Sequence, residues 1–307
     1  MSIFNFNLPS TGIQPSESFT VMRLRIVLVY VGSLSAFFVK PTSGLIALTL
    51  IGFYFRAFGA EGGHHRYFAH RSFKTGRIFQ FVLACLGASS GQRGPLWWAF
   101  FHRAHHRYTD RPLDPHSPIG KGRWYAYLGW LFDKDNDYNR DTNLDSAKDL
   151  TRYPELVWVN KYHYLFPYLY LLAVYAIGQW TPLLGGHRGL AAVAWGFFVS
   201  TLLSLQGSLM VNAFAHSART GWFTYRSYRT ADSSLNNWLL SLPSLGASWH
   251  NNHHHYMNSA RAGFRWWELD LTYLTLRVLA MLGLVWDLHE APSHLVLKQG
   301  ELDVEAS

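Results

Sequence analysis

The sequence predicts an all-α integral membrane protein with four transmembrane helices and a cytosolic helical cap. Charged residues make up only 15% of the 307-residue chain, against roughly 25% in ordinary soluble domains. Aromatic residues reach 17%, including 13 Trp. Four apolar segments also approach the length of about 20 residues that crosses a bilayer. Few charges, many tryptophans and long apolar runs are together typical of a chain that lies in lipid.

The four predicted spans form two helical hairpins. Residues 24–39 and 44–59 form the first hairpin, and Arg56 lies near enough to the end of its helix to snorkel toward the interface. Residues 164–180 and 190–214 form the second hairpin, joined by a turn that contains Pro182. Residues 78–101 are also apolar, but Gly91, Gly94 and Pro95 interrupt them. We therefore expect an interfacial or partly buried helix there and not a fifth span.

The distribution of basic residues predicts the orientation. Of the 27 Lys and Arg residues, only Lys40 and Arg188 fall in the two hairpin turns, which leaves 25 on the other side. Short loops poor in Lys and Arg lie outside, so both termini and the long middle segment should be cytoplasmic. We expect residues 1–307 to form a single integral-membrane domain with flexible ends at 1–20 and 292–307. The chain has a net charge of +8, but its basic residues do not form a stripe with the geometry that reads a nucleic-acid groove. Membrane lipid is therefore an expected partner and nucleic acid is not.

Histidine is the unusual residue of this chain, because its 16 copies nearly equal the 19 acidic residues. Nine of them fall into four groups: His65 and His70; His102, His105 and His106; His216; and His250, His253 and His254. Spacing of i, i+3 and i+4 puts three side chains on one helix face, so each of the two triplets can point at one place. Asn212 shares a face with His216 in the same way. His65 and His70 are about 140° apart on an ideal helix, so this pair should straddle a helix end.

These groups predict a histidine-rich centre with two metal ions held by the cap. Imidazole suits Zn, Cu, Fe or Ni, and nine ligands exceed the needs of one ion but match two ions with four or five each. A bound imidazole also needs a partner for its second ring nitrogen. The candidates near the groups are Glu61, Asp110, Asp114, Asp232, Asn236 and Asn251. We expect His64 and His255 to flank the site and His163, His187 and His289 to lie outside it, and the sequence leaves His116 open.

The spacing of the histidine groups, H-x4-H, H-x2-H-H and H-x2-H-H with Asn212 four residues before His216, resembles that of the membrane-bound fatty acyl desaturases, the acyl-CoA desaturase family. The resemblance extends to Gly129-Trp130 and to Trp249-His250-Asn251-Asn252. It is greatest to bacterial members, through Gly94-Pro95-Leu96-Trp97-Trp98 and Ser259-Ala260-Arg261. It covers residues 24–288, which is nearly the whole chain.

The resemblance implies an enzyme in a bacterial inner membrane that uses two Fe ions and O2 as co-substrate to introduce a cis double bond, at the ninth carbon, into a fatty acyl thioester or lipid. By resemblance the nine histidines are iron ligands, and Asn212 is an outer ligand that acts through water. The acyl chain would lie in a closed apolar tunnel, because a strong oxidant must be shielded from water. The chain carries neither a dinucleotide fingerprint nor the cysteines of an iron–sulfur cluster. An external donor is therefore implied, a ferredoxin- or cytochrome-like protein with its reductase.

Two departures and three alternatives accompany this interpretation. Phe100-Phe101 stands where animal members have an Arg-Asp pair, so contacts to the acyl carrier need not match theirs. Gly246-Ala247-Ser248 replaces the usual Gly-Glu-Gly and removes a carboxylate.

A hydroxylase or acetylenase on the same scaffold would use the same ligands. A histidine-rich metal transporter is disfavoured, since transport sites lie near the bilayer midplane and every histidine group here lies at or beyond a span end. A non-catalytic haem or metal anchor would need fewer ligands.

Overall fold

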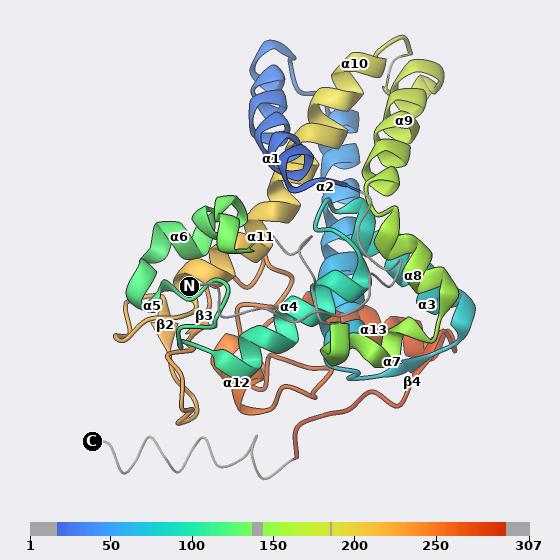
Figure 1. The fold of residues 1–307 in the computed structure, drawn as a ribbon. Helices are drawn as coiled ribbons and strands as arrows, with labels where there is room; N and C mark the ends of the chain where they lie inside the picture. Colours follow the sequence, from blue (N-terminus) through green and yellow to red (C-terminus); the bar gives the residue numbers. More distant parts are fainter. Residues whose placement is uncertain (1–16, 137–143, 185, 293–307) are drawn as a thin grey trace.

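The computed structural model describes residues 17–136, 144–184 and 186–292. Long helices rise together from one end of a wider helical cap (Figure 1). They are α1 (Phe19–Ser33) with its 3₁₀ extension η1 (Leu34–Phe38), α2 (Ser43–Phe58), α9 (Leu165–Trp180), and a continuous helix made of α10 (Gly189–Ala192), the π-helical η7 (Val193–Val199) and α11 (Ser200–Phe214). The fold class is therefore confirmed as all-α.

Three of these helices are long and apolar enough to cross a membrane: Phe19–Phe38, Ser43–Ala69 and Gly189–Phe214, with 20, 27 and 26 residues. The predicted fourth span, α9, stands beside them in Figure 1 but has only 16 residues. Apolar side chains on the outer faces are exposed, and Phe38 at the end of η1 is 90% exposed. Such a surface is expected where lipid covers the protein. The structure thus supports a membrane protein with three long spans, and the fourth remains a prediction.

Polar caps and close packing fix the two hairpins. The Val21 amide donates to Ser18 Oγ at the start of α1, and the Leu45 amide donates to Thr42 Oγ1 at the start of α2. Side-chain oxygens at this position satisfy amides that have no partner inside the helix. Residues 17–20, which belong to the segment expected to be flexible, lead into and include the first turn of this helix, and the rest of that N-terminal segment lies outside the described residues. In the second hairpin Gly178 faces Ala192 so closely that a Cβ on Gly178 would lie 2.4 Å from the Ala192 Cβ.

Arg56 corrects one expectation, because it does not snorkel. The π-helical segment η2 (Gly59–Ala69) continues α2, so Arg56 lies in the middle of a 27-residue helix and is only 1% exposed. Its guanidinium donates to Thr201 Oγ1 at 2.7 Å and to Ser200 Oγ, and it lies 4.1 Å from the centre of the Tyr170 ring. Arg56 therefore joins α2 to α11 and α9 inside the bundle.

The cap is built from short elements packed beneath the spans. Its α-helices are α3 (Arg77–Ser89), α4 (Pro95–Tyr108), α5 (Pro118–Lys121), α6 (Arg123–Tyr127), α7 (Lys148–Thr151), α8 (Pro154–Lys161), α12 (His250–His255) and α13 (Leu271–Met281). Its 3₁₀ turns are η3 (Gly129–Phe132), η4 (Lys134–Asn136) and η5 (Leu144–Ala147), and η6 (Pro182–Leu184) lies in the second hairpin turn. Strand β1 (Lys74–Thr75) pairs antiparallel with β4 (Val285–Trp286), and β2 (Thr224–Tyr225) pairs antiparallel with β3 (Asn236–Asn237). The predicted break at residues 91–95 is confirmed, since it separates α3 from α4.

The main apolar core lies where the cap meets the bundle. It includes Phe68 of η2, Leu83 of α3, Leu96 of α4, Leu156 of α8 and Leu276 of α13, none more than 1% exposed. This core fixes η2 against α3 and α4. Segments η2 and α4 carry the first two histidine groups.

Candidate metal centre

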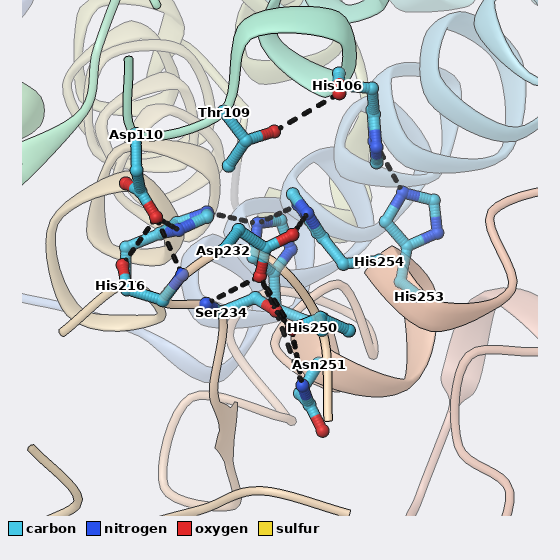
Figure 2. Close-up of polar contacts among 12 residues, drawn as sticks. His106, Thr109, Asp110, His216, Asp232, Ser234, His250, Asn251, His253 and His254 are labelled. Carbon is cyan, nitrogen blue, oxygen red and sulfur yellow. Dashed lines mark hydrogen bonds and ion pairs between the residues drawn. The ribbon is translucent and has the colours of Figure 1, made fainter. Parts of the chain in front are cut away.

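The nine candidate histidines come together beneath the spans in two neighbouring groups. The five-histidine group is His65, His70, His102, His106 and His253, and the four-histidine group is His105, His216, His250 and His254. Within each group the potential ligand atoms lie within 4.8 Å of one another. The structure therefore gathers the nine histidines into sets of five and four, the numbers expected for two ions, and Figure 2 shows members of both groups side by side.

A π-helix brings the first pair of histidines together. In η2 the amide of His70 donates to the carbonyl of His65 at 3.1 Å, which is the i→i+5 pattern of a π-helix. The His65 and His70 rings are 4.9 Å apart at their centres. His70 is the C-cap residue of this segment, so the expectation that the pair straddles a helix end is confirmed.

Helices α4 and α12 each contribute ligands to both groups. His102 and His106, at i and i+4 of α4, enter the five-histidine group, whereas His105 enters the four-histidine group. Helix α12 does the reverse: its i and i+4 residues enter the four-histidine group and His253, at i+3, enters the five-histidine group. The expectation that each triplet points at one place is therefore wrong, because each helix lies between the two groups.

The ring nitrogens within each group face one another at short range. Neighbouring Nε2 atoms are 2.8 Å apart for His102 and His70, 3.0 Å for His65 and His253, and 2.9 Å for His250 and His216. Metal–nitrogen bonds of about 2.1 Å at right angles would give nitrogen–nitrogen separations of about 3 Å. Both groups have the spacing of ligands around a shared cation.

Carboxylates orient the rings, and they are the four acids predicted from the sequence. The Nδ1 atoms of His65, His105 and His254 lie 2.8, 2.9 and 2.9 Å from carboxylate oxygens of Glu61, Asp114 and Asp232, respectively. Asp110 lies 3.5 Å from Nδ1 of His216. An Nδ1 proton held by a carboxylate leaves the Nε2 lone pair directed into the group. Lone pairs that face one another repel, and a cation between them removes the repulsion.

The two amides predicted to orient imidazoles do not contact them. Oδ1 of Asn251 accepts from the backbone amides of Ser227 and Tyr228, both at 2.8 Å. Nδ2 of Asn236 donates to Oδ1 of Asn252 at 2.7 Å. Both side chains hold the backbone around α12 in place, and their predicted role was wrong.

Burial favours the uncharged form of six of these imidazoles, and contacts with His105 favour the charged form of the Asp114 carboxylate. Burial lowers the pKa of His70, His102, His106, His250, His253 and His254 well below the usual value, and neighbouring imidazoles add to the effect. Burial alone would raise the pKa of Asp114, but the charge and hydrogen bond of His105 outweigh it and lower that pKa. Neutral imidazoles and ionised carboxylates are the states that metal binding requires.

The other histidines among the described residues lie outside these two groups. His64 is buried beside Trp98, and His255 is exposed and stacks on Tyr228 with ring centres 4.1 Å apart. His163 is buried 3.6 Å from Glu17, His187 lies exposed in the second hairpin turn, and the His289 amide donates to the Ser72 carbonyl. His116, which the sequence left open, is buried with its ring 4.4 Å from that of His105, and together with His105 and Asp114 it forms a further possible donor set.

An apolar cavity runs from the spans to the five-histidine group. Met22 of α1, Trp97 and Phe101 of α4, and Leu205 and Leu209 of α11 form much of its wall. His102 of the five-histidine group, His116 and Asn212 also line it. Phe101 packs with its ring centre 4.3 Å from that of Trp97 and belongs to an aromatic cluster with Trp130. At this position the cavity wall is therefore apolar.

Sequence reasoning missed two polar features near the site. Ser208 Oγ donates to Gln92 Oε1 at 3.2 Å within the cavity wall. Arg66, next to His65, forms a two-pronged ion pair with Asp270 at 3.0 and 2.9 Å, and both side chains are at most 3% exposed. The partners in each contact are far apart in the sequence, so no local pattern could have paired them.

Comparison with known proteins identifies relatives over most of the chain. The family model described as fatty acid desaturase matches residues 17–287. An acyl-CoA C20 Delta5-desaturase of Anemone leveillei is 34% identical, over 78% of this chain and 71% of the relative. An sn-2 palmitoyl-lipid 9-desaturase of a Nostoc strain is 33% identical, over 80% and 82%. A hex-5-enoyl acyl-carrier-protein acetylenase of Moorena producens is 35% identical, over 80% and 74%.

Proposed function

Since this chain belongs to the fatty acid desaturase family, and is thus a membrane oxidoreductase, we propose that it uses two iron ions and O2 to introduce a cis double bond into a fatty acyl chain. The observation that carries the proposal is the pair of histidine groups beside an apolar cavity. Imidazole ligands suit iron, and carboxylate partners on His65, His105, His216 and His254 fix the ring orientations.

The protein's own residues supply ligation, positioning and exclusion of water. The nine histidines would hold the ions, and Asn212, which lines the cavity, would act on one ion through a water molecule. Bound iron would supply the O2 chemistry that removes two hydrogens from unactivated methylenes. The aromatic and aliphatic cavity wall would hold the acyl chain with one pair of carbons at the centre, which lowers the barrier and keeps water from the oxidant.

The relatives differ in their acyl carriers, because their names specify acyl-CoA, lipid and acyl-carrier protein. We propose a fatty acyl thioester or lipid as substrate and the ninth carbon as the site of the double bond, as in the name of the Nostoc relative. The Moorena acetylenase supports a second candidate, conversion of an existing double bond to a triple bond.

Expression in a desaturase-deficient host, followed by mass spectrometry of derivatised fatty acids, tests the proposal. We expect new monounsaturated acids with a cis double bond at the ninth carbon. An acetylenic product would instead support the second candidate. A hydroxylated product, or no product from iron-loaded protein supplied with electrons, would contradict both.

We also propose that both termini and all the histidine groups are cytoplasmic, in a bacterial inner membrane. The partition of basic residues supports this orientation, because Lys40 and Arg188 occupy the turns at the far end of the spans. The proposed electron donor, a ferredoxin- or cytochrome-like protein with its reductase, would then meet the cap.

Labelling of single cysteines in a Cys85→Ala background tests the orientation. Lys40→Cys and His187→Cys place exposed thiols in the two turns, and Lys134→Cys places one on the cap. Leu184, also in the second turn, is only 7% exposed and is too buried to serve as a labelling position. A membrane-impermeant maleimide applied to intact cells should label the first two variants and label the third only after lysis. Labelling of Lys134→Cys in intact cells would reverse the proposed orientation.

A further inference from the structure

The loops around the four-histidine group carry a cluster of exposed arginines. They are Arg107, Arg111, Arg219, Arg226 and Arg229, and each side chain is exposed. We call this cluster the arginine surface. Its members come from three segments: the end of α4, the chain after α11, and the chain after β2.

Hydrogen bonds hold these three segments together. The Ser233 amide donates to Oδ2 of Asp110 at 2.7 Å, and the Ser217 amide donates to the Ser233 carbonyl at 2.9 Å. Nη2 of Arg226 donates to the carbonyl of Asp232 at 2.6 Å. The arginine surface is therefore one continuous part of the cap.

The acids of the same segments turn inward. Asp110 faces His216, and Asp232 bonds His254, as Figure 2 shows. Their charges are thus directed at the metal centre and do not offset the arginines at the outer surface. The exposed charged side chains of these three segments are therefore all arginines.

This surface also lies close to the metal centre and away from the hairpin turns. Two contacts, Arg226 to Asp232 and Asp232 to His254, connect it to a candidate ligand. In Figure 1, β2, β3 and α12 lie at the end of the molecule opposite the turns. The arginine surface is therefore on the side that the proposed topology exposes to the cytoplasm.

We propose that the arginine surface docks an acidic one-electron carrier of the ferredoxin type, and that electrons enter through the four-histidine group. The proposal rests on the proposed function. One O2, two hydrogens of the acyl chain, two protons and two electrons give the olefin and two water molecules, so each turnover oxidises two reduced carriers. Complementary charge raises the association rate of such partners and makes binding sensitive to salt.

Charge reversal tests the docking surface by direct binding. The variant Arg107→Glu/Arg229→Glu leaves Arg226 in place, because Arg226 supports the loop of Asp232. The control Lys40→Glu/Arg152→Glu makes the same charge change at exposed positions in the first hairpin turn and beside α7. The measured quantity is the Kd of an oxidised plant-type [2Fe–2S] ferredoxin for the protein in phosphatidylcholine nanodiscs at low salt. We expect the first variant to bind at least tenfold more weakly and the control to stay within twofold of the unaltered protein.

Equal Kd values for the two variants would overturn the docking surface. So would weakening that occurs only in nanodiscs containing phosphatidylglycerol, because the arginines would then contact lipid. A separate assay isolates the proposed function: protein reduced with dithionite should form one olefin per centre when acyl substrate and O2 are added, in both variants. No olefin from the unaltered protein would contradict the proposed function and leave the Kd result independent of it.

Discussion

The His105→Ala variant should lose desaturation by more than about 100-fold, a larger loss than the 10- to 100-fold typical of changes to groups that only orient a metal ligand. His105 lies in the four-histidine group, its Nδ1 is held by Asp114, and its buried Nε2 has no partner among the described residues. Removal of this imidazole should release the ion of its group. Iron content should fall from two ions per chain toward one, while the thermal unfolding profile of metal-free protein stays close to that of the unaltered protein.

His187→Ala is the matched control for this substitution. His187 is exposed in the second hairpin turn and contacts Gln179, far from both groups. This variant should keep its iron and its activity. Full activity and two ions per chain in His105→Ala would exclude His105 as a ligand.

The Asp270→Ala variant should be strongly destabilised without the loss of any proposed ligand. Asp270 pairs with Arg66 and also accepts the amides of Ala262, at 2.7 Å, and Tyr273, at 2.9 Å, where it caps α13. Its removal breaks the two-pronged pair of a buried guanidinium and leaves Glu61, 3.2 Å from Arg66 Nε, as the carboxylate partner of Arg66 among the described residues. Loss of one member of a buried ion pair typically costs about 3–5 kcal/mol. The free energy of unfolding, or the melting temperature in detergent, should fall accordingly.

The pair between Lys74 and Asp287 provides the control for that measurement. It has a similar distance, 2.8 Å, but its side chains are 66% and 56% exposed. Solvent screens such a pair, so Asp287→Ala should leave the melting temperature nearly unchanged. Equal melting temperatures for the Asp270→Ala and Asp287→Ala variants would contradict the assigned role of Asp270.

Features that depend on local composition or spacing could be predicted from the sequence. The apolar segments, the break before Pro95 and the histidine groups are of this kind. Asp110 and Asp114 follow the second histidine group directly, so their proximity to its imidazoles followed from chain connectivity. Asp232 was less local, but it is the one acidic residue between His216 and the last histidine group.

Features that depend on packing between distant segments could not be predicted. The division of each histidine triplet between the two groups depends on how α4 and α12 are rotated about their axes, which tertiary contacts determine. The burial of Arg56 depends on Ser200 and Thr201, more than 140 residues away. The alignment of His65 with His70 depends on a π-helix, whose i→i+5 bonds have no simple sequence pattern.

The metal content of the purified protein tests the central claim most directly. Protein produced with ample iron and purified without O2 should contain two iron ions per chain by elemental analysis. X-ray absorption should show that both iron ions are bound by histidine nitrogen. A content of one ion per chain, or full olefin formation by protein that contains zinc and no iron, would contradict a di-iron centre formed by the two histidine groups.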